Sequence, residues 1–249
     1  MKSPSAFENM GPTQKQSKST SMVTKGDTFV SVREVTRSYW SGDQPVHALR
    51  GVNLELERGA LVVLKGRSGS GKTTLLNLIG GLDKPSSGAI EFEGQRLDRL
   101  TDGELTMLRR QRLGFIFQSF ALLPTYSAFE NVELILRIAG MSGKEKNERA
   151  QRCLRAVGLT HWMDHRPDEM SGGQQQRVQV ARAIATRPDL ILADEPTGEL
   201  DTATSRQIFN LLRQVVEKEG TTVLVATHDA IGEEYADIVY QLVDGKCVA

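Results

Sequence analysis

The sequence predicts an α/β protein built on a mainly parallel β-sheet that is covered by helices. Three unbroken apolar runs indicate this fold class: "ALVVLKG" (60–66), "LILADE" (190–195) and "TVLVATH" (222–228). Runs of this length are typical of strands buried on both faces, as in a parallel sheet. Each run ends in glycine or polar residues, and open α/β sheets bind ligands at the carboxyl ends of their strands. We therefore expect Gly66, Asp194, Glu195 and His228 to lie along one functional edge.

Other segments predict smaller layers beside this sheet. Three stretches alternate apolar and polar residues, as half-buried antiparallel strands do: "TFVSVREV" (28–35), "VNLELE" (52–57) and "GAIEFEG" (88–94). Between residues 119 and 169 the apolar spacing becomes i, i+3, i+4, which predicts an inserted helical subdomain. A last helix begins after Asp201 and ends at Gly220, because glycine is common just past helix ends.

The composition argues against several classes of function. Lys+Arg and Asp+Glu number 31 each among 249 residues, so no global positive field would recruit nucleic acid or an anionic membrane. Cys153 and Cys247 have neither zinc-site nor disulfide-framework spacing, which fits a reducing cytosol. No apolar run approaches the ~20 residues that cross a bilayer.

Residues 1–26 are polar and slightly basic and lack the apolar segment of a secretory signal. We expect a disordered tail here, because these residues offer little apolar surface to offset the entropy of ordering them. A transit peptide is the weaker alternative, since the segment has no arginine and no amphipathic period. Residues 27–249 are then expected to form the folded domain.

A phosphate-binding loop follows the first buried run. "GRSGSGKT" (66–73) matches the pattern G-x-x-x-x-G-K-[ST] and opens a predicted helix, although a glycine-rich turn without a ligand is the alternative. Its glycines let backbone N–H groups point at phosphate oxygens beside a positive helix end. Lys72 is expected to reach the β- and γ-phosphates, and the Thr73 hydroxyl to bind Mg²⁺. The expected nucleotide contacts are Gly66, Arg67, Ser68, Gly69, Ser70, Gly71, Lys72, Thr73 and Thr74.

Two acids end the second buried run. In P-loop NTPases an aspartate at such a strand end completes the Mg²⁺ shell, which is the role we assign to Asp194. Neighbouring strand residues face opposite sides, so Glu195 should point elsewhere and act as the general base for the attacking water. The alternative is that both acids only cap the helix that follows.

The segment "MSGGQQQRVQVARAIATRPDLILADEPTGELD" (170–201) decides among the many NTPases. It resembles the signature helix, Walker B strand and D-loop of the ATP-binding cassette (ABC) family, and its S-G-G-Q core is Ser171, Gly172, Gly173 and Gln174. Ser171 can cap the helix, and the glycines leave N–H groups open to an anion. The resemblance implies that this core completes the ATP site of a second subunit in a head-to-tail homodimer. An ordinary capped amphipathic helix is the alternative.

The resemblance covers residues 28–249 and implies the ABC ATPase fold. That fold is a P-loop NTPase (RecA-like) core with a mainly parallel sheet, an antiparallel β subdomain and an inserted helical subdomain. The nucleotide-binding core with its β subdomain would be residues 27–118 and 171–249, and the helical subdomain residues 119–170. ATP and Mg²⁺ are the implied cofactors, and ATP rather than GTP rests on the resemblance.

Three further residues match family motifs. Gln118 in "GFIFQSF" matches the Q-loop, which contacts Mg²⁺ and the attacking water and relays to the membrane partner. His228 in "VATHD" matches the switch histidine that contacts the γ-phosphate, although alone it would suggest a core or capping histidine. Tyr39 matches the aromatic residue that stacks on adenine, with Trp40 as the alternative. The implied catalytic residues are Glu195, His228, Gln118 and Lys72, and the implied metal ligands are Thr73, Gln118 and Asp194.

Residues 46–97 and 109–134 look like the MacB/LolD/FtsE group of the family. This implies an ATPase that is peripheral at the cytoplasmic face of the inner membrane and drives a separate integral membrane permease subunit, in export or lipoprotein release, with no nucleic acid partner. The alternative is a cell-division-type regulator that uses the same ATP cycle to control a cell-wall hydrolase without transport. The apolar segment 120–132 is the candidate docking surface for the permease, or else part of the helical core.

Overall fold

The computed structural model describes residues 28–248, so the tail expected at residues 1–26 lies outside the described residues. The strands are β1 (Thr28–Ser41), β2 (Gln44–Glu57), β3 (Leu61–Lys65), β4 (Ser87–Phe92), β5 (Gln95–Arg96), β6 (Leu113–Ile116), β7 (Leu190–Asp194), β8 (Thr222–Thr227), β9 (Ile238–Val243) and β10 (Lys246–Val248). The α-helices are α1 (Lys72–Ile79), α2 (Asp102–Arg112), α3 (Ala128–Ile138), α4 (Gly143–Ala156), α5 (Gly172–Ile184) and α6 (Thr202–Glu219). Short 3₁₀ helices span Leu97–Arg99, Thr160–Trp162, Pro167–Glu169 and Ala230–Tyr235.

The larger sheet has six strands in the order β10-β9-β3-β8-β7-β6. Its strands pair in parallel except at β10, which pairs antiparallel with β9. The three apolar runs form the adjacent strands β3, β8 and β7, and every residue of β8 is buried. The mainly parallel sheet expected from the sequence is therefore confirmed. Because parallel strands bring their carboxyl ends to one edge, the ends of β3, β7 and β8 lie together.

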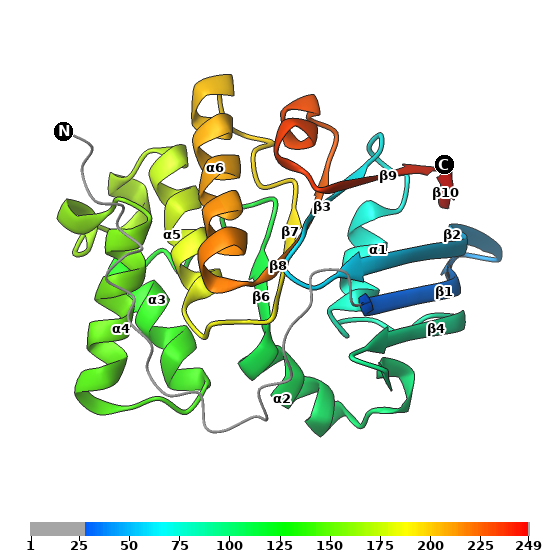
Figure 1. The fold of residues 1–249 in the computed structure, drawn as a ribbon, viewed down its shortest axis with the longest axis horizontal. Coiled ribbons are helices and arrows are strands. Elements are labelled where there is room, and N and C mark those ends of the chain that lie inside the picture. Colours follow the sequence, from blue (N-terminus) through cyan, green and yellow to red (C-terminus); the bar gives the residue numbers. More distant parts are fainter. Residues whose placement is uncertain (1–27, 249) are drawn as a thin grey trace.

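This sheet separates two hydrophobic cores. Val63 and Val225 join residues of α3, α4, α5 and α6 in one core, whereas Val62 and Leu224 join residues of α1 and the second sheet in the other. Neighbouring residues serve opposite cores because side chains alternate across a strand. As a result α1 and α5 lie on opposite faces of the six-stranded sheet (Figure 1).

The smaller sheet is antiparallel, in the order β2-β1-β4-β5, as the alternating stretches predict. β1 and β2 extend well past those stretches and form a long hairpin. Gly42 and Asp43 make its two-residue turn, and Gly42 has the positive φ (+61°) that such turns favour.

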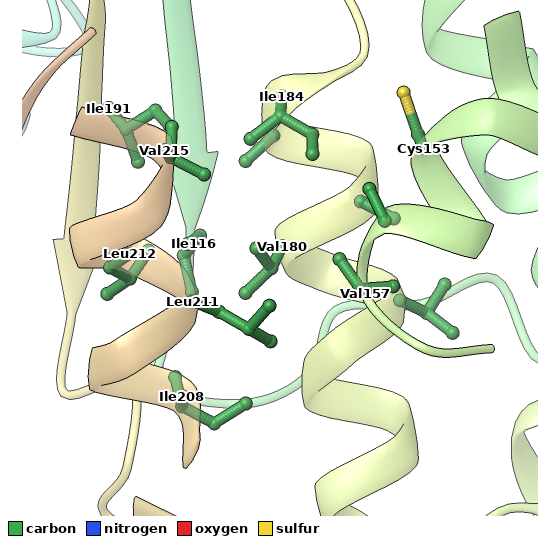
Figure 2. Packing of buried hydrophobic residues seen from close by; sticks show 14 of the residues in the cluster. Ile116, Cys153, Val157, Val180, Ile184, Ile191, Ile208, Leu211, Leu212 and Val215 are labelled. Carbon is green, nitrogen blue, oxygen red and sulfur yellow. The ribbon is translucent and has the colours of Figure 1, made fainter. Parts of the chain in front are cut away.

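The helices α3 and α4 confirm that residues 119–169 contain helices, as their apolar spacing predicts. Their buried residues join those of α5 and α6 in one cluster, and in Figure 2 Ile116 and Leu211 point toward Val180 of α5. The sequence pattern does not predict α2 and β6, because an arginine-rich helix runs directly into a strand of only 4 residues. Among the helices that the structure describes, none has the length and apolar character to span a membrane.

β6 and α5 approach so closely that Gly114 of β6 admits no side chain. A Cβ at Gly114 would lie 2.5 Å from the Ala183 carbonyl oxygen of α5 and 3.1 Å from Ile191 Cγ1. The signature helix is therefore fixed against the strand that leads to Gln118.

We expect Gly114→Ala to destabilise the fold by about 1–3 kcal/mol, because backbone atoms must move to admit the methyl group. Urea unfolding measures this change in the free energy of unfolding. Gly103→Ala is the matched control, because Gly103 lies in α2 and a Cβ there would meet only Thr101 Oγ1, at 3.9 Å. The control should unfold at the same or a higher urea concentration than the wild type, and equal destabilisation in both variants would contradict the close packing of β6 on α5.

Candidate functional site

The phosphate loop joins β3 to α1 in the order that the sequence predicts. Gly69 and Gly71 have φ values of +79° and +105°, which favour glycine. Space also requires glycine, since a Cβ at Gly66 would lie 2.5 Å from the Leu242 carbonyl oxygen and one at Gly71 2.6 Å from that of Ala48. Gly71 begins α1 without a side-chain cap, so the first N–H groups of the helix are available to an anion.

The side chains of the loop divide between its tip and its base. Arg67 and Ser68 are exposed at the tip, and Thr74 is half-buried in the first turn of α1. Ser70 is buried, and its hydroxyl has no hydrogen-bond partner among the described residues. A buried hydroxyl without a partner is uncommon, so the loop offers both N–H groups and this hydroxyl to a ligand.

Lys72 carries a positive charge into the base of the loop. Its side chain is 6% exposed and its ammonium donates to the carbonyl oxygens of Gly66 (2.8 Å) and Arg67 (3.2 Å). The same Nζ lies 3.1 Å from Glu195 Oε1. Buried charges need such partners, and the contact of Lys72 with the β- and γ-phosphates stays a prediction.

Asp194 ends β7 beside the start of α1. Its Oδ2 accepts a hydrogen bond from the Thr73 hydroxyl at 2.7 Å, whereas its buried Oδ1 has no partner among the described residues. Burial raises the pKa of Asp194 above its usual value; the bond from Thr73 opposes this rise and the charge of Glu195 adds to it.

These oxygens fit the metal that the sequence implies. A divalent cation would supply the positive charge that Asp194 Oδ1 lacks, and hydroxyl and carboxylate oxygens are ligands that Mg²⁺ prefers. The described residues contain no cluster of three or more His, Cys, Asp or Glu side chains that could hold a metal. Mg²⁺ commonly keeps several waters and phosphate oxygens as ligands, so the oxygens of Thr73 and Asp194 fit such a site, and Gln118 stays a predicted further ligand.

Glu195 does not continue the strand, and the expectation that it points away from the loop is wrong. β7 ends at Asp194, and Glu195 has φ +46° with its N–H bonded to the Ala226 carbonyl oxygen at 2.8 Å. Because its backbone is left-handed and not extended, the Glu195 side chain does not follow the alternation of side chains along a strand. Both carboxylates consequently contact the start of α1, Asp194 through Thr73 and Glu195 through Lys72.

His228 follows β8 and completes the cluster. Its Nδ1 lies 3.0 Å from Glu195 Oε2, while its side chain is 65% exposed. Although burial raises the pKa of Glu195, the hydrogen bonds from His228 and Lys72 lower it overall. Glu195 is 9% exposed, and its position beside the loop makes its carboxylate a candidate acceptor for the proton of a water molecule.

The signature residues begin α5 on the other side of the sheet. Ser171 Oγ accepts from the Gln174 N–H at 3.3 Å, and Gln174 Oε1 accepts from the Ser171 N–H at 2.8 Å, which is a reciprocal cap. Gly173 passes close to α6, where a Cβ would lie 2.7 Å from Thr204 Cγ2, and Gly172 lies beside Phe120. The structure does not bring Ser171–Gln174 into contact with the Lys72 cluster of the same chain.

Gln118 and Tyr39 lie at the margins of the site. Gln118 follows β6, the strand beside β7, and is exposed without a hydrogen bond to another described residue. The Tyr39 hydroxyl donates to Asp83 at 2.8 Å, and the Arg37 guanidinium lies over the tyrosine ring at 4.6 Å. Trp40 is 76% exposed against 38% for Tyr39, so Trp40 has the freer ring and the choice of stacking residue stays a prediction.

Two contacts of the site are missing from the sequence-based expectations. The first is the pairing of His228 with Glu195, which the adjacency of β7 and β8 produces. The second is Gln179 of α5, a fully buried glutamine whose amide binds the backbone of Phe117, next to Gln118. Its only sequence signal is a polar residue between Val178 and Val180.

Comparison with known proteins gives one family throughout. A family model described as ABC transporter matches residues 49–198. The chain is 44% identical over 222 residues to an uncharacterized ABC transporter ATP-binding protein of Methanocaldococcus jannaschii, covering 88% of this chain and 94% of that protein. It is 42% identical over 222 residues to the lipoprotein-releasing system ATP-binding protein LolD of Geobacter metallireducens, covering 89% and 99%. It is 44% identical over 221 residues, or 89% of this chain, to the macrolide export ATP-binding/permease protein MacB of Hyphomonas neptunium, of which it spans 34%.

Solved structures give the same result. A dimeric ATP-binding cassette in a post-hydrolysis state, bound to ADP and Pi, is 43% identical with a TM-score of 0.82, covering 88% of this chain and 97% of that chain. The cassette cbiO1 from Clostridium perfringens, part of an ABC transporter complex, is 29% identical with a TM-score of 0.81, covering 90% and 88%.

We expect Asp194→Asn to stabilise the free protein at pH 7. A carboxyl whose pKa is raised in the folded state stabilises that state while protonated, and the contribution is lost as pH rises through the raised pKa. The neutral amide avoids this loss, so the variant should melt at a higher temperature than the wild type at pH 7 in EDTA, and the difference should vanish below about pH 4.

Asp189→Asn is the matched control, because Asp189 pairs with Arg112 at 2.5 Å and its replacement should lower the melting temperature. In a separate titration Asp194→Asn should weaken Mg²⁺-dependent nucleotide binding by about tenfold or more. A fall of the melting temperature in both variants would contradict the unfavourable burial of Asp194 Oδ1 without a partner among the described residues.

Proposed function

The chain belongs to the ABC transporter family and is an ATPase, and from this we propose that it acts as a homodimer that drives a separate integral membrane subunit. The single observation that carries the proposal is the division of its functional residues by the sheet. Lys72, Thr73, Asp194, Glu195 and His228 converge at one place, whereas Ser171–Gln174 begin a helix on the opposite face.

The convergent residues have complementary tasks in ATP hydrolysis. The N–H groups at the start of α1 and the Lys72 ammonium bind and orient the phosphates. Thr73 and Asp194, together with Gln118 at the next strand end, would hold Mg²⁺, which when bound neutralises charge on the phosphates. Glu195 accepts the proton of the attacking water. His228, held by Glu195 through Nδ1, presents the remainder of its exposed ring to the γ-phosphate.

The exposed start of α5 supports the second half of the proposal. Ser171 is exposed and capped only by its own turn, and the positive end of α5 favours an anion. A second copy arranged head to tail would place its ATP there, so that each site contains Ser171–Gln174 of the other subunit. The related cassette bound to ADP and Pi is dimeric, which supports this arrangement.

We expect Glu195→Gln to bind ATP with nearly wild-type affinity, to hydrolyse it about 10²–10⁴-fold more slowly and to accumulate as an ATP-bound dimer. The amide keeps the size of the side chain but cannot take the proton of the water. Light scattering after gel filtration with ATP measures the dimer, and ADP should leave a monomer. A monomer with saturating ATP would contradict the shared site.

The double variant Glu195→Gln, Ser171→Asp is the control for the signature residues. Aspartate caps helices as well as serine does, so α5 should remain folded, but its charge would repel the phosphates of the partner's ATP. It should bind ATP as a monomer. Persistence of the dimer would show that Ser171 does not face the partner's nucleotide.

A cavity of about 340 Å³ next to the Q-loop is the proposed docking surface for the membrane subunit. Its lining combines apolar and basic side chains from α2, β6, α3, α5 and the loop after β6: Arg109, Arg110, Leu113, Phe115, Phe117, Ala121, Ile135, Ile138, Arg182 and Ala183. Of the segment 120–132, only Ala121 lines it, because Leu122 and Phe129 pack against the core. Leu122 and Phe129 thus belong to the helical core, and a docking role for the rest of the segment stays part of this proposal.

The occupant that fits this cavity is a segment of the membrane subunit with apolar residues and an acidic one. Arg110 is exposed at the cavity and has no ion pair with another described residue, so it is free to meet a carboxylate. This docking would make the chain a peripheral protein at the cytoplasmic face of the membrane.

We expect Ile138→Glu to weaken capture of the membrane subunit from detergent extracts by about tenfold or more, because it puts a charge on the apolar wall of the cavity. Met107→Glu is the matched control, since Met107 of α2 is 47% exposed against 46% for Ile138 but lies outside this cavity. Equal capture by both variants would rule out this cavity as the docking surface.

Export or lipoprotein release is the proposed task of the complex, because the named relatives are a lipoprotein-releasing ATPase and a macrolide exporter. Mass spectrometry of the captured membrane subunit, followed by reconstitution in vesicles, tests this. ATP-driven movement of a lipid-linked or amphiphilic substrate would support it. Activation of a cell-wall hydrolase without movement of any substrate would instead establish the regulatory alternative.

A further inference from the structure

Gln179 is a polar side chain buried at the centre of the fold. It lies on α5, the helix that begins with the signature residues, and it is 0% exposed. A buried amide requires partners for its acceptor and its donors, so the choice of partners shows what the residue holds.

The amide of Gln179 pairs with the backbone on both sides of Gln118. Its Oε1 accepts from the Phe117 N–H at 2.9 Å, and its Nε2 donates to the Phe117 carbonyl oxygen at 3.1 Å. Nε2 also lies 3.4 Å from the Ser119 carbonyl oxygen and 3.2 Å from Gln176 Oε1. The Phe117 N–H can only donate and its carbonyl can only accept, so this pairing fixes the orientation of the amide.

These bonds lie where β6 ends, directly before Gln118. β6 leaves its partner strand after Ile116, which pairs with Ala193. From Phe117 onward a side chain of α5 replaces the ladder that a neighbouring strand would supply. The position of Gln118 is therefore set by α5 as well as by the sheet.

We propose that Gln179 is a positioning residue that ties Gln118 to the signature helix, so that engagement of the partner's nucleotide by Ser171–Gln174 fixes Gln118 in its own ATP site. This inference rests on the proposed homodimer and on the proposed role of Gln118. α5 moves as one rigid rod over this short distance, and the two ATP sites of the dimer are linked through it.

Gln179→Met tests the proposal, because methionine keeps the length of the side chain and removes every bond to Phe117. The kcat for ATP should fall about tenfold or more while KM changes less than about threefold, since the bound nucleotide is unaffected. Gln176→Met is the matched control: Gln176 is 1% exposed on the same helix and its Nε2 has no partner among the described residues. Its Oε1 accepts from Gln179 Nε2 at 3.2 Å but makes no bond to the loop, so this variant leaves both bonds between Gln179 and Phe117 in place. It should change kcat and KM by less than about twofold.

A double-mutant cycle with Gln118→Ala separates positioning from general damage to the fold. If Gln179 acts through Gln118, then Gln179→Met should lower kcat no further in the Gln118→Ala background. Equal falls in both backgrounds would overturn the proposal.

Gln179→Glu gives a second readout through its pH dependence. The carboxyl can serve both backbone groups of Phe117 only while it is protonated, so the ratio of its kcat to that of the wild type should be highest at low pH. A ratio as low as that of Gln179→Met at every pH between about 6 and 8 would overturn the proposal.

Amide hydrogen exchange of residues 117–120 measures the tether without any hydrolysis. Exchange should be faster in Gln179→Met than in Gln176→Met and the wild type, all without nucleotide. Unchanged exchange would overturn the tether even if kcat falls. Because this measurement needs neither dimer nor membrane subunit, its outcome is independent of the dimer test with Glu195→Gln, and failure of one is distinguishable from failure of the other.

Discussion

The buried ion pair between Lys72 and Glu195 is the interaction on which the functional edge depends. Taking two such charges out of water costs several kcal/mol per ion, and their attraction offsets this only where further hydrogen bonds complete both groups. The Lys72 ammonium also donates to the carbonyl oxygens of Gly66 and Arg67, and the Glu195 carboxylate also makes a hydrogen bond with His228 Nδ1. Glu195 also holds a left-handed backbone conformation, which costs about 1–2 kcal/mol outside glycine. The ion pair and its hydrogen bonds thus hold the Lys72 ammonium and the Glu195 carboxylate in the positions that the proposed hydrolysis requires.

The same edge carries a buried hydrogen-bond acceptor and a set of hydrogen-bond donors. Among the described residues, Asp194 Oδ1 is a buried carboxylate oxygen without a partner, and α1 begins without a side-chain cap for its first N–H groups. The magnesium-bound triphosphate that we propose as ligand would bring a cation for Asp194 Oδ1 and anionic oxygens for the N–H groups.

The six-stranded sheet separates the residues of the proposed site into two groups on opposite faces. Side chains alternate along its strands and pack into separate cores on the two faces, so α1 lies on one face and α5 on the other. α5 in turn contacts β6 so closely that Gly114 has no room for a methyl group, and its Gln179 holds the backbone of Phe117. Arg182 of the same helix donates to the Ala121 carbonyl oxygen at 2.6 Å and lines the proposed docking cavity. One helix thus contacts the Q-loop and the proposed docking cavity and begins with the signature residues.

The sequence by itself determined the central strands, the phosphate loop and the chemistry at the strand ends, because apolar runs and a glycine motif are local signals. The resemblance to ABC proteins added the signature residues, Gln118 and His228. Only the tertiary structure decided the direction of Glu195, since its turn depends on a bond to Ala226 in another strand. It likewise decided that the Tyr39 side chain contacts Arg37 and Asp83, whereas the Trp40 ring is exposed. It also decided that Gln179 makes hydrogen bonds with the backbone of Phe117. The physical reason is that periodicity encodes which side chains are buried, whereas the partner of a buried polar group is chosen by residues far away in the chain.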